Sequence, residues 1–310
     1  MIRKKSFADL CRRMRKQRAY YLLALPGLIY FIIFHYVPMY GIIIAFKDYN
    51  IYQGIMKSPW VGLAEFKRLF GLDGFQRAFW NTVIISFEKM VTGFPLSIII
   101  ALMLNELRRK RFNKFISTSI MIPHFISWVV IYGLAYSMLS PNVGLIKSVW
   151  SVLAPAEKVP SLLTSRSAFR PIIVLSHCWR NAGFASIMYT AAIAGIDTQL
   201  YEAAQIDGAG RWKQMLHVTL PCILPTIITM WMLRLGDLLG ADFEQVLLFL
   251  NSSTMKTGDV IDTFVYRMGL REAQYSLSTA SGLFKSVLSL IAVLGTNALV
   301  KRYNRENAIL

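Results

Sequence analysis

The chain has 310 residues, of which 55% are hydrophobic and 16% are charged, and its formal net charge is +17 at pH 7. Soluble domains carry about 25% charged residues, so this composition excludes an ordinary soluble domain. The basic balance resembles that of nucleic-acid-binding proteins, but the positive charge lies beside apolar runs, where topology-setting charges belong. Eight Lys and Arg fall within residues 1–18 and five within 108–114. We therefore expect a membrane protein and no nucleic-acid partner.

Long apolar runs predict an all-α polytopic membrane protein with six transmembrane helices. A helix needs about 20 mostly apolar residues to cross the hydrocarbon core. Runs of this kind lie at about 20–45, 80–105, 115–139, 171–195, 221–250 and 279–300, with an irregular outer part expected in the fifth. The first run is longer than the roughly 7–15 residues of a signal-peptide core. We interpret it as a retained membrane helix that follows a basic tail at 1–19 and begins one transmembrane domain over 20–310.

The distribution of Lys and Arg predicts that both termini lie in the cytoplasm. One side of the membrane receives 18 Lys and Arg in 63 residues, from the segments 1–19, 106–114, 196–220 and 301–310. The other side receives 12 in 93 residues, from the segments 46–79, 140–170 and 251–278. Because cytoplasmic loops carry the excess of basic residues, the segment 196–220 is expected to face the cytoplasm.

A short helix is predicted in the first outer loop, where residues 59–71 read PWVGLAEFKRLFG. Apolar residues recur there at helical spacing: Leu63, Phe66, Leu69 and Phe70. An amphipathic helix of this kind either lies on the membrane surface or packs against neighbouring helices, and the sequence favours neither.

Residues 197–221 predict a helical hairpin between two spans. Asp197 is a residue type favoured at helix starts, and good helix formers follow from Gln199 to Ile206. Gly208 and Gly210 then permit a tight turn with positive φ. A compact, stiff element of this kind can transmit force to a partner, which a flexible loop cannot.

The second helix of the hairpin is expected over 211–218. Trp212, Met215 and Leu216 share one face of it at spacings of three and four residues. Pro221 suits the first turn of the membrane helix that follows, because the missing N–H of proline is not needed there.

A resemblance to the membrane subunits of bacterial ABC importers begins at residues 201–221, which read YEAAQIDGAGRWKQMLHVTLP. The stretch holds E-A-A, three residues, Gly, nine residues and V-x-L-P, and this spacing resembles the EAA loop of that family, with Val218 in place of the usual Ile. In the family the loop docks in a cleft of a separate ATPase. The resemblance implies an ATPase-coupling role for Glu202, Ala203, Ala204, Gly208, Trp212, Met215 and Leu216.

The resemblance covers nearly the whole chain, with a permease core at about 78–300. It is carried by VIDTFVYRMGL at 260–270, QYSLSTASGLFKSVLSL at 274–290 and LPGLIYFIIFHYVPMYGIIIAFKDYN at 25–50, which are similar to the polysaccharide and oligosaccharide importer permeases. The family implies the type I importer fold in a bacterial cytoplasmic membrane. It also implies a second related permease, two ATPase subunits that hold ATP and Mg²⁺, and an external binding protein, with no cofactor on this chain.

Ionisable residues inside the predicted spans are functional suspects, because burial in the bilayer is costly. Candidates for a translocation path are Glu88, Lys89, Arg180, Arg234, Asp237 and Lys285. Structural roles remain open: Arg234 and Asp237 are three residues apart and suit mutual neutralisation, and Lys285 suits snorkelling to the interface. Glu88 and Lys89 suit bonds to neighbouring helices. Arg180 has no obvious partner in the sequence and is the strongest pore-lining candidate.

The excess of cations over anions in this set favours an acidic cargo, such as a uronic-acid oligosaccharide. Within the family, permeases for alginate-like polysaccharides fit this pattern. Aromatic residues available to stack on sugar rings are Trp128, Tyr132, Trp179, Tyr189 and Trp231. Aromatic residues at span ends also form the interfacial belts that contact lipid.

The sequence shows no catalytic constellation. It contains no G-x-x-x-x-G-K-[ST] phosphate loop, and its His and Cys residues lack metal-ligand spacing. An ABC importer permease for saccharides is therefore weighed against an ion-coupled secondary sugar carrier, with Glu88 and Asp237 as cation sites, and against a membrane scaffold without transport. The hairpin at 202–221 favours the importer, because a self-contained carrier needs no surface for an ATPase.

Overall fold

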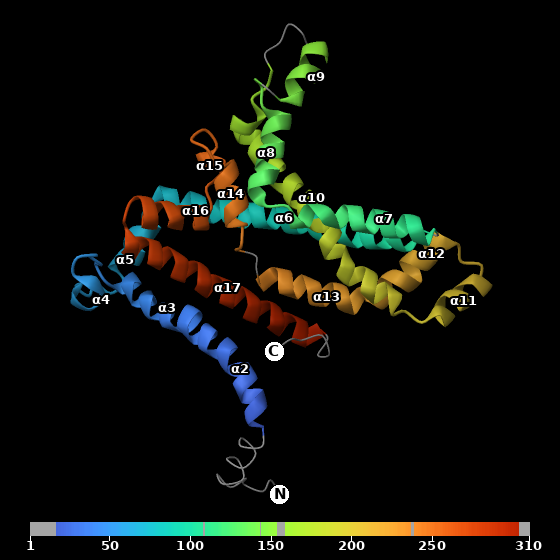
Figure 1. Cartoon of the computed structure of the whole chain (residues 1–310), viewed down its shortest axis with the longest axis horizontal. Helices are drawn as coiled ribbons and strands as arrows, with labels where there is room; N and C mark the ends of the chain where they lie inside the picture. Colours follow the sequence, from blue (N-terminus) through green and yellow to red (C-terminus); the bar gives the residue numbers. More distant parts are fainter. Residues whose placement is uncertain (1–16, 108, 143, 154–158, 237–238, 304–310) are drawn as a thin grey trace, which may run out of the picture.

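The computed structural model describes residues 17–107, 109–142, 144–153, 159–236 and 239–303. Within these ranges it is all-helical, with one isolated bridge between Lys47 and Trp60 and no strand. The α-helices (Figure 1) are α2 (Arg18–Phe31), α3 (Val37–Met39), α4 (Gly54–Lys57), α5 (Ala64–Phe70), α6 (Asp73–Asn105), α7 (Lys110–Met121), α8 (Trp128–Leu139), α9 (Leu145–Leu153), α10 (Arg166–Ala194), α11 (Thr198–Ile206), α12 (Arg211–Gln214), α13 (Leu220–Gly236), α14 (Phe243–Phe249), α15 (Met255–Gly258), α16 (Ile261–Tyr266) and α17 (Tyr275–Tyr303). Tighter or wider helical turns are η1 (Ile32–Tyr36), η2 (Tyr40–Phe46), η3 (Ile122–Phe125), η4 (Leu162–Thr164), η5 (Met215–Thr219) and η6 (Arg267–Arg271).

The described residues contain fewer clear membrane spans than the six predicted. Four helices are long and apolar enough to cross a membrane, at Arg18–Phe46, Asp73–Asn105, Arg211–Leu235 and Tyr275–Ala298. A fifth is added if the bent pair Lys110–Phe125 and Trp128–Leu139 counts as one span. The predicted span 171–195 lies in α10, which has 29 residues but is less apolar because it carries several charged and polar side chains. The all-helical prediction is confirmed, whereas the count of six is not.

Helix α6 is the spine of the molecule. Three buried apolar clusters follow one another along it and include its residues Phe75, Ile85 and Ala101. The first cluster joins α6 to α5, α16 and α17, the second to α10 and α14, and the third to α10 and α13. Since lipid is as apolar as these side chains, close van der Waals packing holds such helices together. Helix α6 therefore sets the positions of α10 and α13, which form the site described below.

The predicted third span, 115–139, is not one straight helix. Helix α7 with η3 and helix α8 meet at an angle of 100°. Pro123 lacks an N–H for helical bonding, and Ser127 starts α8 as an N-cap, since its Oγ accepts a hydrogen bond from the Val130 N–H at 3.4 Å. The apolar pattern runs through the bend without interruption, so hydropathy alone predicted a single helix.

The bend is held by Arg180 of α10. Its Nε donates to the carbonyl oxygen of Ile126 at 3.1 Å, and its guanidinium lies 4.7 Å from the centre of the Trp128 ring. The carbonyl belongs to the residue between η3 and α8, where the helical ladder is interrupted. Arg180 therefore satisfies a backbone group that the bend leaves without a helical partner.

The predicted fifth span, 221–250, is displaced and interrupted. A continuous helix runs from Arg211 to Leu235 through α12, η5 and α13, so Pro221 lies inside a helix and does not begin one. Helix α14 follows after a non-helical segment, in which Asp242 has φ = 55°. This left-handed conformation is unfavourable for most residues but accessible to Asp and Asn. The expected irregular outer part of the span is confirmed.

The ends of α6, α10 and α16 are tied together by polar contacts. Asn81 of α6 donates to the Asp259 carbonyl at 2.9 Å and accepts from Arg170 of α10 at 2.9 Å. The Asp259 carboxylate, 5% exposed, accepts from Arg267 at 2.6 Å. The hydrogen bond to Asp259 raises the pKa of the Arg267 guanidinium above its ordinary value. Predicted helix 59–71 is found as α5, whose Leu69 is fully buried while Leu63 is exposed.

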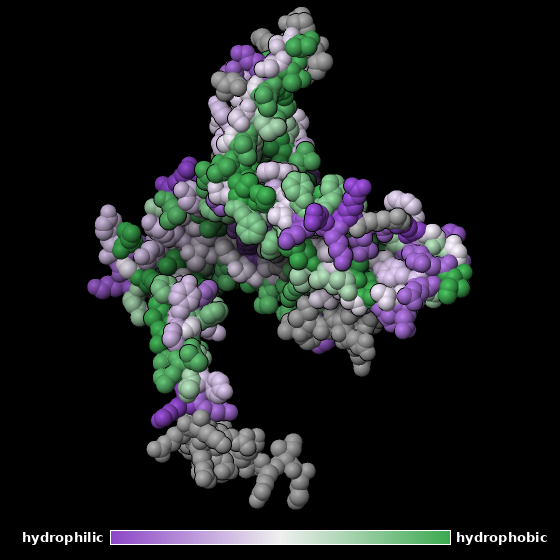
Figure 2. All heavy atoms as spheres, turned by 45° about the vertical axis from the view of Figure 1, so that its right-hand side comes forward, coloured by the Kyte–Doolittle hydropathy of each residue, from purple (hydrophilic) through white to green (hydrophobic). Residues whose placement is uncertain are grey.

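The first span stands apart from the helices around α6. Only 6% of the most apolar stretch of Arg18–Phe46 is buried, and most of its large apolar side chains from Tyr20 to Ile42 are exposed. Figure 2 shows hydrophobic surface on this arm and on α8. The C-terminal end of this first span, η2, packs on α17. The start of α2 and the end of α17 lie on the side away from α4 and α5 (Figure 1).

Candidate functional site

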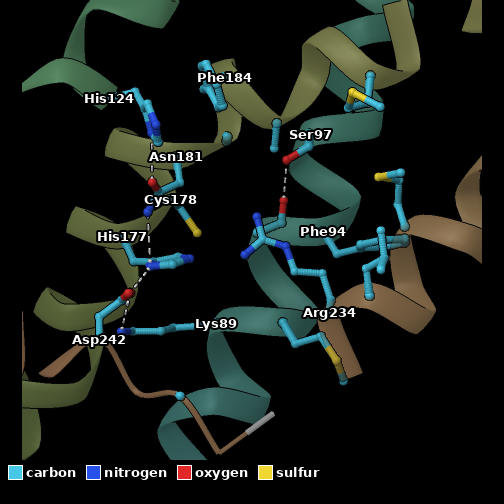
Figure 3. Close-up of a pocket in the computed structure, with 18 of the residues that line it drawn as sticks. Lys89, Phe94, Ser97, His124, His177, Cys178, Asn181, Phe184, Arg234 and Asp242 are labelled. Atoms are coloured by element: carbon cyan, nitrogen blue, oxygen red, sulfur yellow. Dashed lines mark hydrogen bonds and ion pairs between the residues drawn. The ribbon is translucent and has the colours of Figure 1, made fainter. Parts of the chain in front are cut away.

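A cavity of about 420 Å³ lies between α6, α10 and α13. Figure 3 shows its labelled side chains, which project inward from these three helices, from η3 and from the segment before α14. Small-molecule sites typically measure about 300–1,000 Å³, so the volume suits a small polar molecule or part of a larger one. One wall is polar and carries Lys89, His177, Asn181 and Asp242, and apolar side chains such as Phe94 and Met188 form other parts of the lining.

Lys89 is the buried anchor of the polar wall. Its side chain is 5% exposed. The ammonium group donates to the Ala241 carbonyl at 2.9 Å, to Gln245 Oε1 at 2.6 Å and to Asp242 Oδ2 at 3.1 Å. A buried charge is tolerated when it is paired and fully hydrogen-bonded. Lys89 therefore fixes the segment between α13 and α14 against α6.

Asp242 joins three elements at the edge of the cavity. The oxygen that lies near Lys89 also lies 2.8 Å from His177 Nδ1 of α10. The His177 ring is 3.2 Å from the Asn181 amide, and Asn181 is 3.1 Å from His124 Nδ1 on η3. These close polar contacts run from α6 across α10 to the bend before α8 (Figure 3), and His177 Nδ1 can hydrogen-bond to only one of Asp242 and Asn181 at a time.

Arg234 enters the cavity from the opposite side. It lies in the last turn of α13, and its guanidinium extends toward the middle of the cavity, opposite His177 (Figure 3). Among the residues that the structure describes, no carboxylate lies within ion-pair distance of Arg234. In the described part of the lining, the charged residues are Lys89, Arg234 and Asp242, so this part carries one more positive than negative charge when the histidines are neutral.

The six candidates from the sequence fall in different places. Lys89 and Arg234 line the cavity. Glu88 does not line it, since the adjacent position on a helix points elsewhere. Arg180 supports the bend before α8, and Lys285 pairs with Asp262 at 2.6 Å. Asp237 lies outside the described residues.

The sequence candidates omit several residues that build the polar wall. Asp242 and His177 stand out in the sequence as ionisable residues near spans, but nothing there shows that they meet Lys89, which lies 153 positions before Asp242. Gln245 and Asn181 carry no sequence signal at all. Among the aromatic candidates, Tyr189 lines the cavity.

The predicted hairpin is present at one end of the molecule, where α11 and α12 lie (Figure 1). Asp197 caps α11, with Oδ1 accepting from the Gln199 N–H at 3.0 Å. Gly208 has φ = 76° and makes the turn, as its lack of a Cβ allows. The second helix does not end before the span, because η5 continues into α13.

The hairpin is tied down yet exposes apolar side chains. Tyr201 and Thr219 hydroxyls lie 2.9 Å apart, and Arg211 pairs with Glu106 at 3.6 Å. Ile206 is 87% exposed and Trp212 is 76% exposed. Ile206 was not among the predicted coupling residues. Of those besides Trp212, Glu202, Ala203, Gly208 and Leu216 are exposed, and Ala204 and Met215 are partly exposed. A fixed surface with exposed apolar side chains is typical of a docking site.

A family model described as "Binding-protein-dependent transport system inner membrane component" matches residues 93–305. The chain belongs to this family. The match includes the C-terminal part of α6 (93–105), the whole polar wall except Lys89, and the hairpin.

Curated relatives support the same assignment. The permease is 43% identical over 306 residues to the polygalacturonan/rhamnogalacturonan transport system permease protein YteP of Bacillus subtilis (strain 168). This alignment covers 99% of the permease and 95% of YteP.

Solved structures share the fold. A chain from a bacterial ABC transporter involved in the import of the acidic polysaccharide alginate has a TM-score of 0.88 and 40% identity, with 95% of the permease and 99% of that chain covered. A chain from a bacterial alginate ABC transporter in complex with an alginate pentasaccharide-bound periplasmic protein has a TM-score of 0.86 and 39% identity, covering 94% and 97%. The permease therefore has the type I ABC importer fold and is an inner membrane component of a binding-protein-dependent transport system.

Proposed function

We propose that this permease forms one half of the pore of an importer for acidic oligosaccharides or polysaccharides. A second, homologous permease would supply the other half. The observation that carries the proposal is the cavity between α6, α10 and α13, whose lining has a positive excess and an apolar side. Both features suit a uronate sugar, which has a carboxylate on one edge and C–H groups on its ring faces.

The relatives support an acidic cargo. Alginate is named as an acidic polysaccharide for one structural neighbour, and polygalacturonan, which is also built of uronic acids, is named for YteP. The exposed apolar faces of the first span suit contact with lipid and with the second permease. An external binding protein would deliver the cargo, as a periplasmic protein is present in the complex of a neighbour.

ATP hydrolysis in this proposal takes place on two separate ATPase subunits, which hold ATP and Mg²⁺, and the permease binds no cofactor. The hairpin at 197–221 is the docking element. It supports this role through its capped first helix, its glycine turn and its exposed Ile206, Trp212 and Leu216 side chains. Because η5 and α13 continue the second helix without a break, movement of the hairpin would be passed directly to Arg234. The hairpin, the tail 1–19 and both chain ends would lie in the cytoplasm.

Reconstitution tests the proposed function. The permease pair, the ATPase and the binding protein are placed in proteoliposomes, and uptake of a labelled oligogalacturonide is measured with ATP, without ATP and with an ion gradient alone. We expect uptake only with ATP and with the binding protein. Uptake driven by an ion gradient alone would identify a secondary carrier, and absence of uptake under every condition would favour a scaffold.

A further inference from the structure

We infer that Arg234 is the residue that binds the carboxylate of an acidic sugar inside the cavity and so determines the preference for charged over neutral saccharides. This inference rests on the proposed function and assigns its specificity to one side chain. Within the described ranges, Lys89 and Asp242 are the other two charged lining residues; they are bound to each other, and Asp242 also binds His177.

The position of Arg234 supports a ligand contact. Its guanidinium extends into the cavity from the end of α13 (Figure 3). A guanidinium offers a planar fork of donors that matches a carboxylate in two parallel hydrogen bonds. Within the described part of the chain, no carboxylate occupies that fork. The negative end of the α13 dipole favours a cation at this place, but it does not satisfy five side-chain donors.

A second, independent observation is a buried hydroxyl in the same lining. Ser86 of α6 is 6% exposed, and its Oγ has no hydrogen-bond partner within the described ranges. Buried polar atoms are normally hydrogen-bonded, and an orphaned one calls for an explanation. A bound carboxylate or sugar hydroxyl would supply the missing partner, because a serine hydroxyl both donates and accepts.

The apolar lining suits the rest of a sugar ring. Phe94 lies beside Tyr189 with ring centres 6.1 Å apart, and beside Trp231 at 5.8 Å. Met188 and Met230 complete this side. Sulfur-containing and aromatic side chains adapt to the C–H faces of a ligand. A small inorganic anion would leave this surface without contact, so the arrangement favours a uronate sugar as the ligand.

The polar wall would keep the ligand at Arg234. Lys89 and His177 both contact the Asp242 carboxylate, so this carboxylate occupies the positions that a sugar carboxylate would need on that wall. Asp242 also repels a second anion nearby. The wall therefore directs a single sugar carboxylate toward the opposite side, where the Arg234 fork is open.

The test compares an acidic ligand with a neutral one of the same length. The complete transporter in proteoliposomes is supplied with a trigalacturonate or with its carboxyl-reduced, neutral counterpart. The same binding protein delivers each ligand to wild-type and variant permeases, so the variant-to-wild-type ratio of uptake reports the permease alone. The variants are Arg234→Gln, Arg234→Lys, Asp237→Asn and, as a control outside the cavity, Arg271→Gln, whose side chain is exposed.

We expect Arg234→Gln to lower uptake of trigalacturonate by about tenfold to a hundredfold, the range set by hydrogen bonds to charged groups. Uptake of the neutral counterpart should stay within about twofold of wild type on the same scale. Arg234→Lys keeps the charge and should recover part of the acidic uptake, and Arg271→Gln should match wild type for both ligands.

Three results would overturn the inference. Equal losses for both ligands in Arg234→Gln would make Arg234 a structural residue. Equal wild-type uptake of both ligands would remove the charge preference while leaving sugar import intact. A loss in Asp237→Asn equal to that in Arg234→Gln would indicate an Arg–Asp pair at the helix end. No ATP-dependent uptake of either ligand by the wild type would instead reject the proposed function, and the inference with it.

Discussion

The ammonium group of Lys89 on α6 lies 3.1 Å from the carboxylate of Asp242, which belongs to the segment between α13 and α14. The lysine side chain is 5% exposed and the aspartate side chain is 38% exposed. The pair fastens the segment between α13 and α14 to α6, at a place where the backbone of Asp242 is left-handed.

Removing either partner of this pair is expected to destabilise the permease. Lys89→Met and Asp242→Asn should each lower the free energy of unfolding by about 2 kcal/mol or more, because a charge is left without its partner. The double variant should regain much of the loss, since an apolar or neutral replacement of both partners is often tolerated. Thermal unfolding of the purified complex in detergent measures all three.

In this experiment, replacing Asp242 by Asn distinguishes the effect of the lost charge from the effect of backbone strain. Asn accepts the left-handed conformation as Asp does, so Asp242→Asn changes the charge alone. If the loss in the double variant equals the sum of the two single losses, the two side chains are not coupled and the structural interpretation of the pair is wrong.

A proline at the hairpin turn should uncouple transport from ATP hydrolysis. Gly208 has φ = 76°, whereas proline holds φ near about −65°. Gly208→Pro therefore cannot form the turn, and we expect ligand-stimulated ATP hydrolysis to be lost while membrane insertion is retained. Gly208→Ala should show a weaker defect, since alanine in this conformation costs about 1–2 kcal/mol.

Gly210 provides the matched control for the hairpin. Its φ is −68°, and a Cβ placed on it would meet no atom within 4 Å. The transporter that carries Gly210→Ala should therefore show the same ligand-stimulated ATP hydrolysis as the wild-type transporter. Retained ligand stimulation in Gly208→Pro would show that the turn geometry is irrelevant to coupling.

A methyl group at Gly183 should disturb the contact between α10 and α7. A Cβ on Gly183 would overlap the carbonyl oxygen of Ile120, which belongs to the α7 backbone and cannot rotate away. We expect Gly183→Ala to lower the free energy of unfolding by about 1–3 kcal/mol, the range for overpacked sites. Gly133→Ala, on α8 with open space around it, should be neutral or stabilising. The melting temperatures of the two variants test this prediction. Equal melting temperatures would contradict the close approach of Gly183 to the Ile120 carbonyl.

Arg180 and Arg234 should differ in which measurement they affect. Arg180 supports the Ile126 carbonyl and stacks on Trp128, so both Arg180→Ala and Arg180→Lys should lower the melting temperature. Neither should alter the ratio of acidic to neutral sugar uptake. A changed ratio at an unchanged melting temperature would return Arg180 to the translocation path predicted from the sequence.

Local chemistry explains which features the sequence predicted. The hairpin depends on a cap at Asp197, a run of helix formers and a turn at Gly208, all of which act within a few residues. The spans at 80–105 and 279–300 follow from the apolar runs themselves. Short-range physics sufficed for these elements, and their existence was predicted correctly.

Tertiary contacts explain what the sequence did not reveal. The bend before α8 depends on Arg180, which is 54 positions away from the carbonyl that it binds. For Lys285 the sequence left open a place in the translocation path or snorkelling to the interface, and the structure pairs it with Asp262 on a neighbouring helix. The polar wall requires α6, α10 and the segment before α14 to meet, and no periodicity along the chain encodes that meeting. The sequence identified Lys89 and Arg234 as ionisable residues within spans. Only the arrangement of the helices shows that Lys89 is paired in the polar wall whereas Arg234 extends into the cavity.

The wide helical turn η5, Met215–Thr219, sets the direction in which the side chains of the following helix, α13, point around the helix axis. Such a turn holds one residue more than a regular α-helical turn, and each residue turns a helix by about 100°. Deleting a single residue there would restore ordinary winding and rotate α13 by roughly that angle. Arg234 would then face away from the cavity, and Met230 and Leu233, which also line it from α13, would turn by the same angle. The one additional residue in η5 therefore determines the direction in which the Arg234 side chain points, more than four helical turns away.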